Sequence, residues 1–425
     1  MRERIAPTTG INWREVRSGR LQSLAERAVR RRLRDLEHGG LTIVCSDGAD
    51  SYGTAADLRA DVTVDSPLFW VDVALGGTLG AAESYILGRW SADDLTALCR
   101  IFARNIALTD GMERGWAGAA SQAARILHAL RRNTRHGALA NIEAHYDLGN
   151  DFFRLVLDET MSYSCAVFES PGESLESASL RKIDIACRKL DLAPSDHLLE
   201  IGTGWGALAI HAARRYGCRV TTTTVSKEQF LLARQRVCEA GLADRVEVIL
   251  RDYRDLSGRY DKIVSIEMIE AVGHEFLPGY FAKCSRLLAD DGLMLLQGIL
   301  MAEHRYESYR RSADFIQRYV FPGSCLLSMA AIGRAVAAGT DMRMIHLEDL
   351  APHYPETLRR WRANFRARQA AIRALGYSQE FVRLWEFYLS YCEAGFEERL
   401  IGNVQLLLAK PGNRRPPITA EAGLP

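Results

Sequence analysis

The sequence has no run of about 20 consecutive apolar residues, the length that a membrane-spanning helix requires. We therefore expect no transmembrane helix. The first residues, Met1 to Pro7, also lack the apolar core of a secretory signal. We expect a protein of the cytoplasm, either soluble or bound peripherally to a membrane.

Paired cysteine motifs are missing as well. The nine cysteines are an odd number, are scattered along the chain, and include no C-x-x-C. This usage indicates reduced thiols rather than a disulfide framework or a zinc site, and we expect no bound metal.

Lysine is scarce, because only six of the 54 basic residues are Lys and the other 48 are Arg. With 53 acidic residues the formal net charge is +1, which argues against a strongly basic nucleic-acid-binding protein. The average composition excludes disorder, collagen and coiled coil for the chain as a whole. Its 425 residues suggest roughly two or three domains.

The first third of the chain predicts a small α+β domain. A helical, Arg-rich pattern covers residues 13–37, and two short β-like runs, at 41–44 and 60–64, are separated by turns at Gly48 and Gly53. Helical periodicity returns over 66–105. We place this domain at 1–120 and an Arg-rich connecting segment at 121–140.

A parallel α/β sheet is predicted after residue 190. Buried strands alternate with helical patterns, as in doubly wound folds. The expected strands cover 197–201, 218–225, 246–250, 262–266 and 293–297, with helices at 227–240 and 277–289. Residues 302–400 are mostly helical in pattern and precede a last strand at 404–409. The catalytic domain is placed at 141–412, followed by a flexible tail at 413–425.

A glycine-rich loop, Gly202 to Gly206, follows the first of these strands, where ligands of such sheets bind. Glycine allows a sharp turn and a close approach to a ligand. The G-x-G-x-G spacing differs from the G-x-G-x-x-G of dinucleotide sites, and no P-loop Lys-Ser/Thr pair follows. Glu200 suits a ligand with an amine, such as S-adenosylmethionine (SAM). The residues favour a methyltransferase over two alternatives, another nucleotide site and a simple packing turn.

Several motifs resemble the cyclopropane-fatty-acyl-phospholipid synthases, whose catalytic half the mycolic acid methyltransferases share. They are H-Y-D-L-G-N-D-F-F at 145–153, Y-S-C at 163–165, L-E-I-G-T-G-W-G at 199–206, R-D-Y-R-D-L at 251–256, I-E-A-V-G at 269–273, Y-V-F-P-G at 319–323 and Y-L-S-Y-C-E-A-G-F at 388–396. The resemblance implies a class I SAM-dependent methyltransferase with a Rossmann-like, seven-stranded sheet. Helical insertions covering a lipid pocket and the small α+β N-terminal domain complete that fold.

The same resemblance implies transfer of a methylene group from SAM to the cis double bond of an unsaturated acyl chain in a membrane phospholipid. A carbocation forms, and in this family a bound bicarbonate ion removes the proton that lets the ring close. The bicarbonate site carries over to Cys165, Glu270, Gln297, the backbone of Ile299, and Tyr354. The position of Gln297 is commonly His, and Gln does not titrate near neutral pH. A methylene or methyl branch is therefore the alternative product.

For SAM, the resemblance points to residues around the strand ends: Tyr163, Ser164, Glu200, Gly202, Thr203, Gly204, Trp205, Gly206, Thr224, Val225, Gln229, Asp252 and Tyr253. Thr224 and Gln229 replace the usual acidic partner of the ribose hydroxyls, and Tyr253 is expected against the adenine. Cys392 is a further candidate active residue, although a core thiol is an equally good interpretation.

The expected partner is the anionic inner face of the cell membrane. Arginines gather at 27–34, 125–135 and 359–373, and each adds about 1 kcal/mol of attraction to an anionic surface. The competing interpretation is an ordinary solvated helix face. Family members often dimerise through the N-terminal domain, so a homodimer is expected, and no nucleic acid. Two further functions are less favoured: an RNA or small-molecule methyltransferase, and a lipid-binding protein without catalysis.

Overall fold

The structure is a computed structural model that describes residues 19–54, 57–113, 148–312, 314–416 and 418. Its contacts divide the chain into two compact units, one drawn from 1–130, 311–322 and 361–400 and the other from 131–310, 323–360 and 401–425. The expected boundaries at 120 and 140 and the arginines at 125–135 lie outside the described residues.

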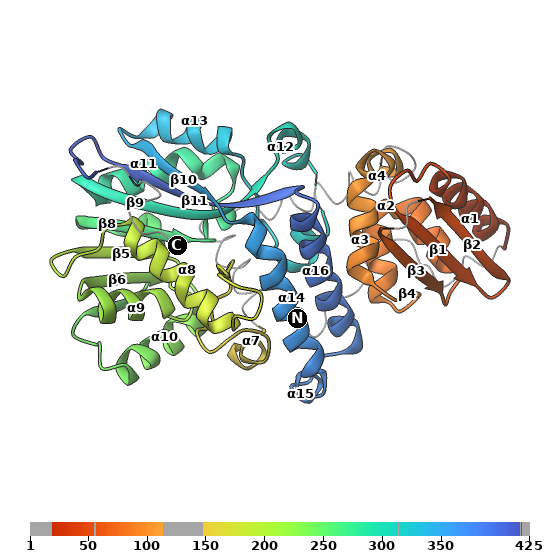
Figure 1. The fold of residues 1–425 in the computed structure, drawn as a ribbon, viewed down its shortest axis with the longest axis horizontal. Coiled ribbons are helices and arrows are strands. Elements are labelled where there is room, and N and C mark those ends of the chain that lie inside the picture. Colours follow the sequence, from red (N-terminus) through yellow and green to blue (C-terminus); the bar gives the residue numbers. More distant parts are fainter. Residues whose placement is uncertain (1–18, 55–56, 114–147, 313, 417, 419–425) are drawn as a thin grey trace. The chain divides into compact units, whose positions relative to one another are not determined.

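The first unit is built on a four-stranded sheet with the order β2-β1-β3-β4 (Figure 1). Strand β1 is antiparallel to β2 and parallel to β3, which is antiparallel to β4. The strands and helices of the N-terminal part are α1 (Gly19–Leu33), β1 (Gly40–Cys45), β2 (Gly48–Gly53), β3 (Arg59–Val64), α2 (Leu68–Ile86), β4 (Trp90–Ala92), α3 (Leu95–Arg104) and α4 (Ile106–Glu113).

Three later segments complete this unit. They are the π-helix η4 (Ile316–Val320), the end of α14 (Tyr354–Ala367) with α15 (Gln369–Ala374), and α16 (Gln379–Glu397). Helix α16 packs on α2 and α3, because the Phe387 ring lies 5.7 Å from that of Tyr85 and Thr96 Oγ1 donates to Glu393 at 3.4 Å. Residues nearly 300 positions apart in the sequence therefore share one core.

The second unit contains the predicted seven-stranded sheet, in the order β10-β11-β9-β8-β5-β6-β7. The five strands from β9 to β7 in this order are parallel, and β11 is antiparallel to both of its neighbours. Their bounds are β5 (His197–Ile201), β6 (Arg219–Thr224), β7 (Val246–Leu250), β8 (Tyr260–Ile266), β9 (Leu288–Met301), β10 (Arg343–Asp349) and β11 (Ile401–Ala409). This is the expected fold class.

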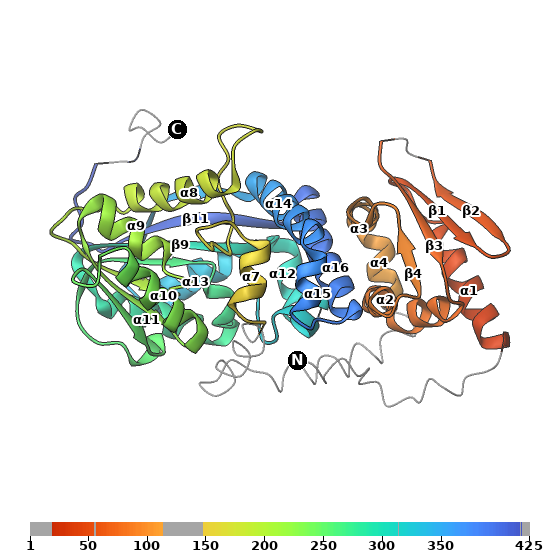
Figure 2. The ribbon, with the colours of Figure 1, turned by 90° about the horizontal axis from the view of Figure 1, so that it is seen from below.

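Helices cover both faces of this sheet. One apolar cluster joins the sheet to α8 (Leu175–Lys189), α9 (Ala207–Tyr216) and α10 (Lys227–Glu239), and a second joins it to α11 (Leu277–Leu287) and α13 (Met329–Gly339). Figure 2 shows α8 on one side of β9 and β11, and α11 and α13 on the other. Shorter elements complete the unit: α7 (Asn150–Val156), η1 (Tyr253–Asp255), η2 (Ile269–Ala271), η3 (His274–Phe276), α12 (Glu303–Tyr309) and η5 (Ala351–His353).

Four local expectations were wrong. Residues 48–53, expected as turns, form strand β2, because they pair along their whole length with β1. Strand β4 interrupts the helical pattern of 66–105, and β10 lies in the region expected to be helical. Strand β9 covers Leu288–Met301 rather than 293–297, so Gln297 lies inside the strand rather than at its end. The missed strands β2 and β10 are edge strands with mostly exposed side chains, so they lack the buried runs that mark central strands.

Within the described residues, no helix has both the length and the hydropathy needed to cross a membrane.

Candidate active site

The glycine loop has the geometry that its sequence predicts. Gly202, Gly204 and Gly206 have φ angles of 102°, 52° and 88°, a region that other residues rarely adopt. The loop is tied to strand β6, because the backbone N–H groups of Gly202 and Thr203 both donate to the carbonyl of Thr223. Helix α9 begins directly after the loop, as in other nucleotide-type sites.

Trp205 anchors the loop to helix α7. Its indole Nε1 donates to Asn150 Oδ1 at 2.7 Å, and its ring lies 5.0 Å from that of Phe153 on α7. The guanidinium of Arg236 donates to the carbonyls of Trp205 and Thr160 at 3.1 and 3.0 Å. Loop segments from distant parts of the sequence are therefore held in one place.

Glu200 is buried beside the loop at the end of β5. Its carboxylate accepts a hydrogen bond of 2.6 Å from Thr222, whose hydroxyl is also 2.7 Å from that of Thr203. Burial raises the pKa of Glu200 to about 8. A buried carboxyl group with a raised pKa gains most from a cationic ligand, because the ligand compensates for lost hydration.

A buried lysine on α8 contacts one of the expected SAM residues. Lys182 Nζ on α8 donates to Ser164 Oγ at 2.8 Å. Burial lowers the pKa of Lys182, whereas the nearby carboxylates of Glu267 and Glu200 act in the opposite direction. Lys182 thus fixes Ser164, one of the expected SAM residues, and compensates part of the negative charge around it.

Four of the remaining expected SAM residues, Thr224, Val225, Asp252 and Tyr253, lie at or shortly after the ends of β6 and β7. Thr224 ends β6 and donates to Gln229 Oε1 at 2.9 Å, so the two expected ribose partners contact each other. Asp252 and Tyr253 follow β7; Asp252 pairs with Arg254, and the Tyr253 ring packs 5.2 Å from that of Tyr280. The sheet therefore gathers these residues at the carboxyl ends of its strands, where open α/β sheets bind their ligands.

A second polar cluster, which we call the carboxylate cluster, is centred on Glu267 immediately after β8. Glu267 Oε1 accepts hydrogen bonds from Cys165 N at 3.0 Å, Gln297 Nε2 at 2.8 Å and Asn403 Nδ2 at 2.7 Å. Its Oε2 accepts one from Tyr354 Oη at 2.7 Å. Four donors around one side chain are the surroundings of an ionised carboxylate.

Glu267 also has an unusual backbone. Its φ of 47° is one of only four positive values among the described residues other than glycine. Such conformations cost about 1 to 3 kcal/mol and persist where the surroundings hold them. The four hydrogen bonds supply that restraint.

Glu270, the second carboxyl group of the cluster, is held differently. Its Oε1 accepts from Ile299 N at 2.6 Å, and its buried Oε2 has no hydrogen-bond partner among the described residues. Burial, and then the charge of Glu267, raises the pKa of Glu270 to about 8. Glu267 thus accepts four hydrogen bonds, whereas its neighbour Glu270 keeps one oxygen without a partner in the described part of the chain.

A chain of amides fixes Gln297 in the cluster. Gln405 lies directly opposite Gln297 on β11 and donates from Nε2 to Gln297 Oε1 at 3.0 Å. Lys189 Nζ in turn donates to Gln405 Oε1 at 2.7 Å and pairs with Glu348. Because an ammonium only donates, this chain sets both amide orientations, and Gln297 must present its NH₂ group to Glu267.

Cys165 contributes its backbone rather than its sulfur. The buried thiol lies 3.3 Å from the carbonyl of Ala166 and 3.6 Å from that of Leu350. Burial raises the pKa of the Cys165 thiol well above its ordinary value, so the thiolate is disfavoured.

Comparison with known proteins identifies the family. Residues 133–406 match the family model described as mycolic acid cyclopropane synthetase. This chain belongs to that family. It is 40% identical to the tuberculostearic acid methyltransferase UfaA1 of Mycobacterium tuberculosis over 92% of each chain, and 35% identical to the cyclopropane-fatty-acyl-phospholipid synthase of Escherichia coli over 83% of this chain and 88% of that one. The crystal structure of mycolic acid cyclopropane synthase CmaA1 with SAH and CTAB superposes with a TM-score of 0.61, at 35% identity, over 64% of this chain and 98% of that one.

The protein is therefore a SAM-dependent methyltransferase of the cyclopropane synthase family. The structure brings together five of the six expected catalytic residues: Cys165, Glu270, Gln297, Ile299 and Tyr354. The sixth, Cys392, belongs to α16 of the other compact unit. Burial raises the pKa of its thiol above the ordinary value, which disfavours a nucleophilic role.

Sequence reasoning missed Glu267, Asn403, Gln405, Lys182 and Lys189. Two signals were available: Glu267 and Glu270 are three residues apart directly after a buried strand, and Asn403 and Gln405 alternate within an otherwise apolar strand.

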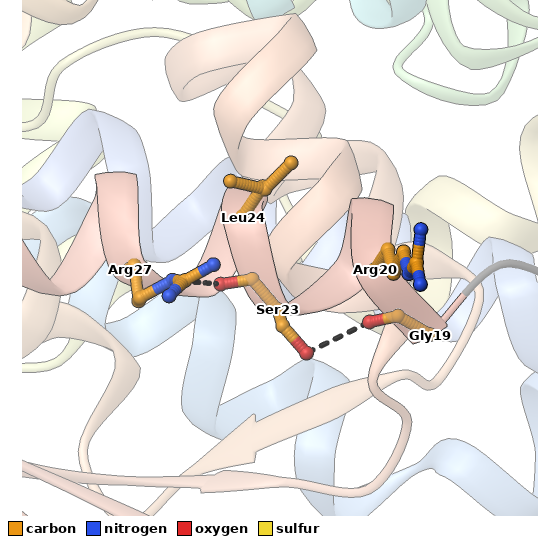
Figure 3. A pocket seen from close by; sticks show the side chains of 5 residues that line it. All are labelled: Gly19, Arg20, Ser23, Leu24 and Arg27. Carbon is orange, nitrogen blue, oxygen red and sulfur yellow. Dashed lines mark hydrogen bonds between the residues drawn. The ribbon is translucent and has the colours of Figure 1, made fainter.

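The structure also has a recess on α1 in the first unit, lined by Gly19, Arg20, Ser23, Leu24 and Arg27 (Figure 3). Its polar groups bond within the helix, because Ser23 Oγ donates to the Gly19 carbonyl and Arg27 Nε to the Ser23 carbonyl. This arrangement offers a cationic surface rather than catalytic groups.

Proposed function

We propose that this protein methylates the cis double bond of an unsaturated acyl chain in a membrane phospholipid, with SAM as the methyl donor, and that the product is a methylene-branched chain. The observation that carries the proposal is the carboxylate cluster at the same sheet edge as the SAM loop. It supplies a base close to the place where a methyl group would be transferred.

The chemistry explains why a base is needed. The π electrons of the alkene form a bond to the methyl carbon, the carbon–sulfur bond breaks, and a carbocation remains on the neighbouring carbon. If the base removes a methyl proton while that electron pair closes on the cation, a cyclopropane forms. If a hydride first shifts from the methylated carbon to the cationic carbon, the cation moves to the methylated carbon, and loss of a methyl proton then gives a methylene branch, C=CH₂. Both products need a base at the new methyl group.

A carbocation also requires a dry site, because water would capture it. The groups around Glu267 meet this condition: Cys165, Gln297 and Asn403 are each 0% exposed. The donor groups that face Glu267 are engaged by its carboxylate, so they are not free to hold water.

The choice of product is supported by the similarity to the Mycobacterium tuberculosis protein UfaA1, which aligns over 92% of each chain. That relative is named a methyltransferase. Cyclopropane formation is the second candidate, favoured by the similarity to the Escherichia coli synthase.

The substrate lies in a bilayer, so the enzyme needs a surface that reaches it. Helix α1 offers one, because Arg20, Leu24, Arg27, Arg31 and Arg34 are all exposed and recur at helical spacing, with Leu24 58% exposed. The opposite face of the helix buries Val29 and Leu33, so these two residues face the core of the unit. We include this cationic face in the proposal as the site of contact with anionic phospholipid.

The arginines at 359–373 suit this role less well. Arg359 and Arg360 pair with Glu356, and Arg366 pairs with Glu386. Their charges are largely compensated within the protein.

The test is to express the protein, with labelled methionine as the source of SAM, in cells whose phospholipids carry cis-monounsaturated chains. Mass spectrometry and NMR of the fatty acids then identify the product. A methylene branch supports the proposal, a cyclopropane supports the second candidate, and an unlabelled lipid pool contradicts both. An Arg27→Glu/Arg31→Glu variant that is active on detergent-dispersed lipid but weak on anionic vesicles would support the membrane contact.

A further inference from the structure

The donors that the family resemblance assigns to bicarbonate are already engaged in this protein. Cys165 N, Gln297 Nε2 and Tyr354 Oη all donate to the carboxylate of Glu267, at 3.0, 2.8 and 2.7 Å. The remaining donor, Ile299 N, donates to Glu270 at 2.6 Å. A free bicarbonate ion would have to displace one or both side chains and lie beside two acidic groups. The residues present do not fit the ion.

We propose that Glu267 takes the place of bicarbonate and is itself the base that removes the proton from the new methyl group. This inference rests on the proposed function, because it assigns a residue to that reaction. A carboxylate and a bicarbonate ion offer the same planar pair of oxygens, so one can occupy the donors that suit the other.

The two oxygens of Glu267 have different surroundings. Oε1 accepts three hydrogen bonds and Oε2 only one, from Tyr354. Oε2 is thus the oxygen with more capacity to receive a proton. In the proposed reaction the methyl C–H bond breaks, its electron pair becomes the second bond to the adjacent cationic carbon, giving C=CH₂, and the proton moves to Oε2, from which it must return to solvent before the next turnover.

A fixed carboxylate also avoids the hazard of alkylation by the carbocation. An ester bond requires the oxygen to come within covalent distance of the cationic carbon, whereas a proton passes between heavy atoms about 2.6 to 3.2 Å apart. Four hydrogen bonds and a restrained backbone oppose the movement that an ester bond requires. Glu267 can therefore accept a proton without coming close enough to the cationic carbon to form an ester.

Substitution of Glu267 tests the assignment. Glu267→Gln keeps the shape and removes the base. Glu267→Gly removes the carboxylate and suits the φ of 47°, so the vacated donors become accessible to a small anion. Glu239→Gln, at an exposed position on α10, is the matched control. Two readouts are used: turnover with labelled SAM and unsaturated phospholipid, in carbon-dioxide-free buffer with and without added bicarbonate or formate, and binding of ¹³C-bicarbonate by saturation-transfer NMR.

We expect the wild type to turn over at the same rate with and without added bicarbonate. We also expect it to show no ¹³C-bicarbonate binding. Glu267→Gln should lose about 100-fold or more in turnover with SAM affinity unchanged. Glu267→Gly should bind the ion and recover turnover when bicarbonate or formate is added.

The assignment is overturned if wild-type turnover depends on bicarbonate, if the wild type binds the ion as well as Glu267→Gly does, or if Glu267→Gln stays active. A wild type that modifies no lipid at all would instead contradict the proposed function. The NMR comparison would still decide whether Glu267 fills the anion site.

Discussion

Gln405 Nε2 lies 3.0 Å from Gln297 Oε1, directly across the β9–β11 pair, and this contact determines which end of the Gln297 amide faces Glu267. If the Gln297 amide were reversed, its oxygen would face Glu267 Oε1, and two acceptors would lie against each other. The chain from Lys189 through Gln405 thus gives Gln297 a fixed role as a donor, which a histidine at the same position would have to achieve through its tautomer.

Removing Gln405 should therefore weaken catalysis without affecting SAM binding. We expect Gln405→Leu to lower turnover about 10-fold, since Gln297 can then rotate and Glu267 loses one oriented donor. Gln235→Ala, at an exposed position, is the control. Turnover on unsaturated lipid and SAM titration calorimetry measure the two effects, and an equal loss of SAM affinity in Gln405→Leu would contradict this role.

Stability should depend on pH through Glu270. Its pKa is raised to about 8, so the native state keeps a proton that the unfolded chain releases above its ordinary pKa of 4.5. The free energy of unfolding therefore falls as pH rises between these values, by up to about 1.4 kcal/mol per pH unit for this group, and levels off above pH 8. Glu200 adds a fall of the same sign.

Denaturant titrations from pH 5 to 9 measure this dependence. Glu270→Gln should have a shallower slope than the wild type, whereas Glu239→Gln should leave the slope unchanged. A slope that is identical in wild type and Glu270→Gln would show that Glu270 does not hold the proton.

SAM binding should depend on the backbone of the glycine loop. Gly204 and Gly241 have φ angles of 52° and 68°, and a Cβ at either position meets no atom within 4 Å. Replacing either by alanine should cost about 1 kcal/mol of stability through backbone strain alone. We expect only Gly204→Ala to weaken SAM as well, because Gly241 lies outside the loop. Equal SAM affinities in the two variants would exclude a close approach of SAM to Gly204.

Membrane contact should depend on the cationic face of α1. Arg27→Glu/Arg31→Glu is expected to reduce binding to anionic vesicles by about 1 kcal/mol or more per residue at low salt. Arg214→Glu/Arg234→Glu makes the same change of charge at exposed positions of the other unit and should bind nearly as the wild type does. Vesicle co-sedimentation distinguishes them, and an equal loss in both variants would mean that net charge, not α1, governs binding.

The sequence predicted the central part of the sheet and the SAM loop because both depend on local signals. Strand β5 is a buried run followed at once by three glycines, and the structure gives all three the positive φ that only glycine tolerates easily. Residues that are adjacent in the sequence therefore contain most of the information needed to predict this strand and loop.

Glu267 was missed because its role depends on distant partners. Gln297, Tyr354 and Asn403 lie 30, 87 and 136 positions away, and no local pattern indicates that they meet. Arg359 and Arg360 were assigned to a basic surface although Glu356 lies at helical spacing, so that pairing was predictable.

The most direct test of the account uses SAM with a fully deuterated methyl group. If a base removes one hydrogen from the transferred methyl, the lipid product gains one carbon and two deuterium atoms, and Glu267→Gln makes almost none of it. A product that retains all three deuterium atoms would mean that the proton is lost elsewhere, and would contradict the role given to Glu267.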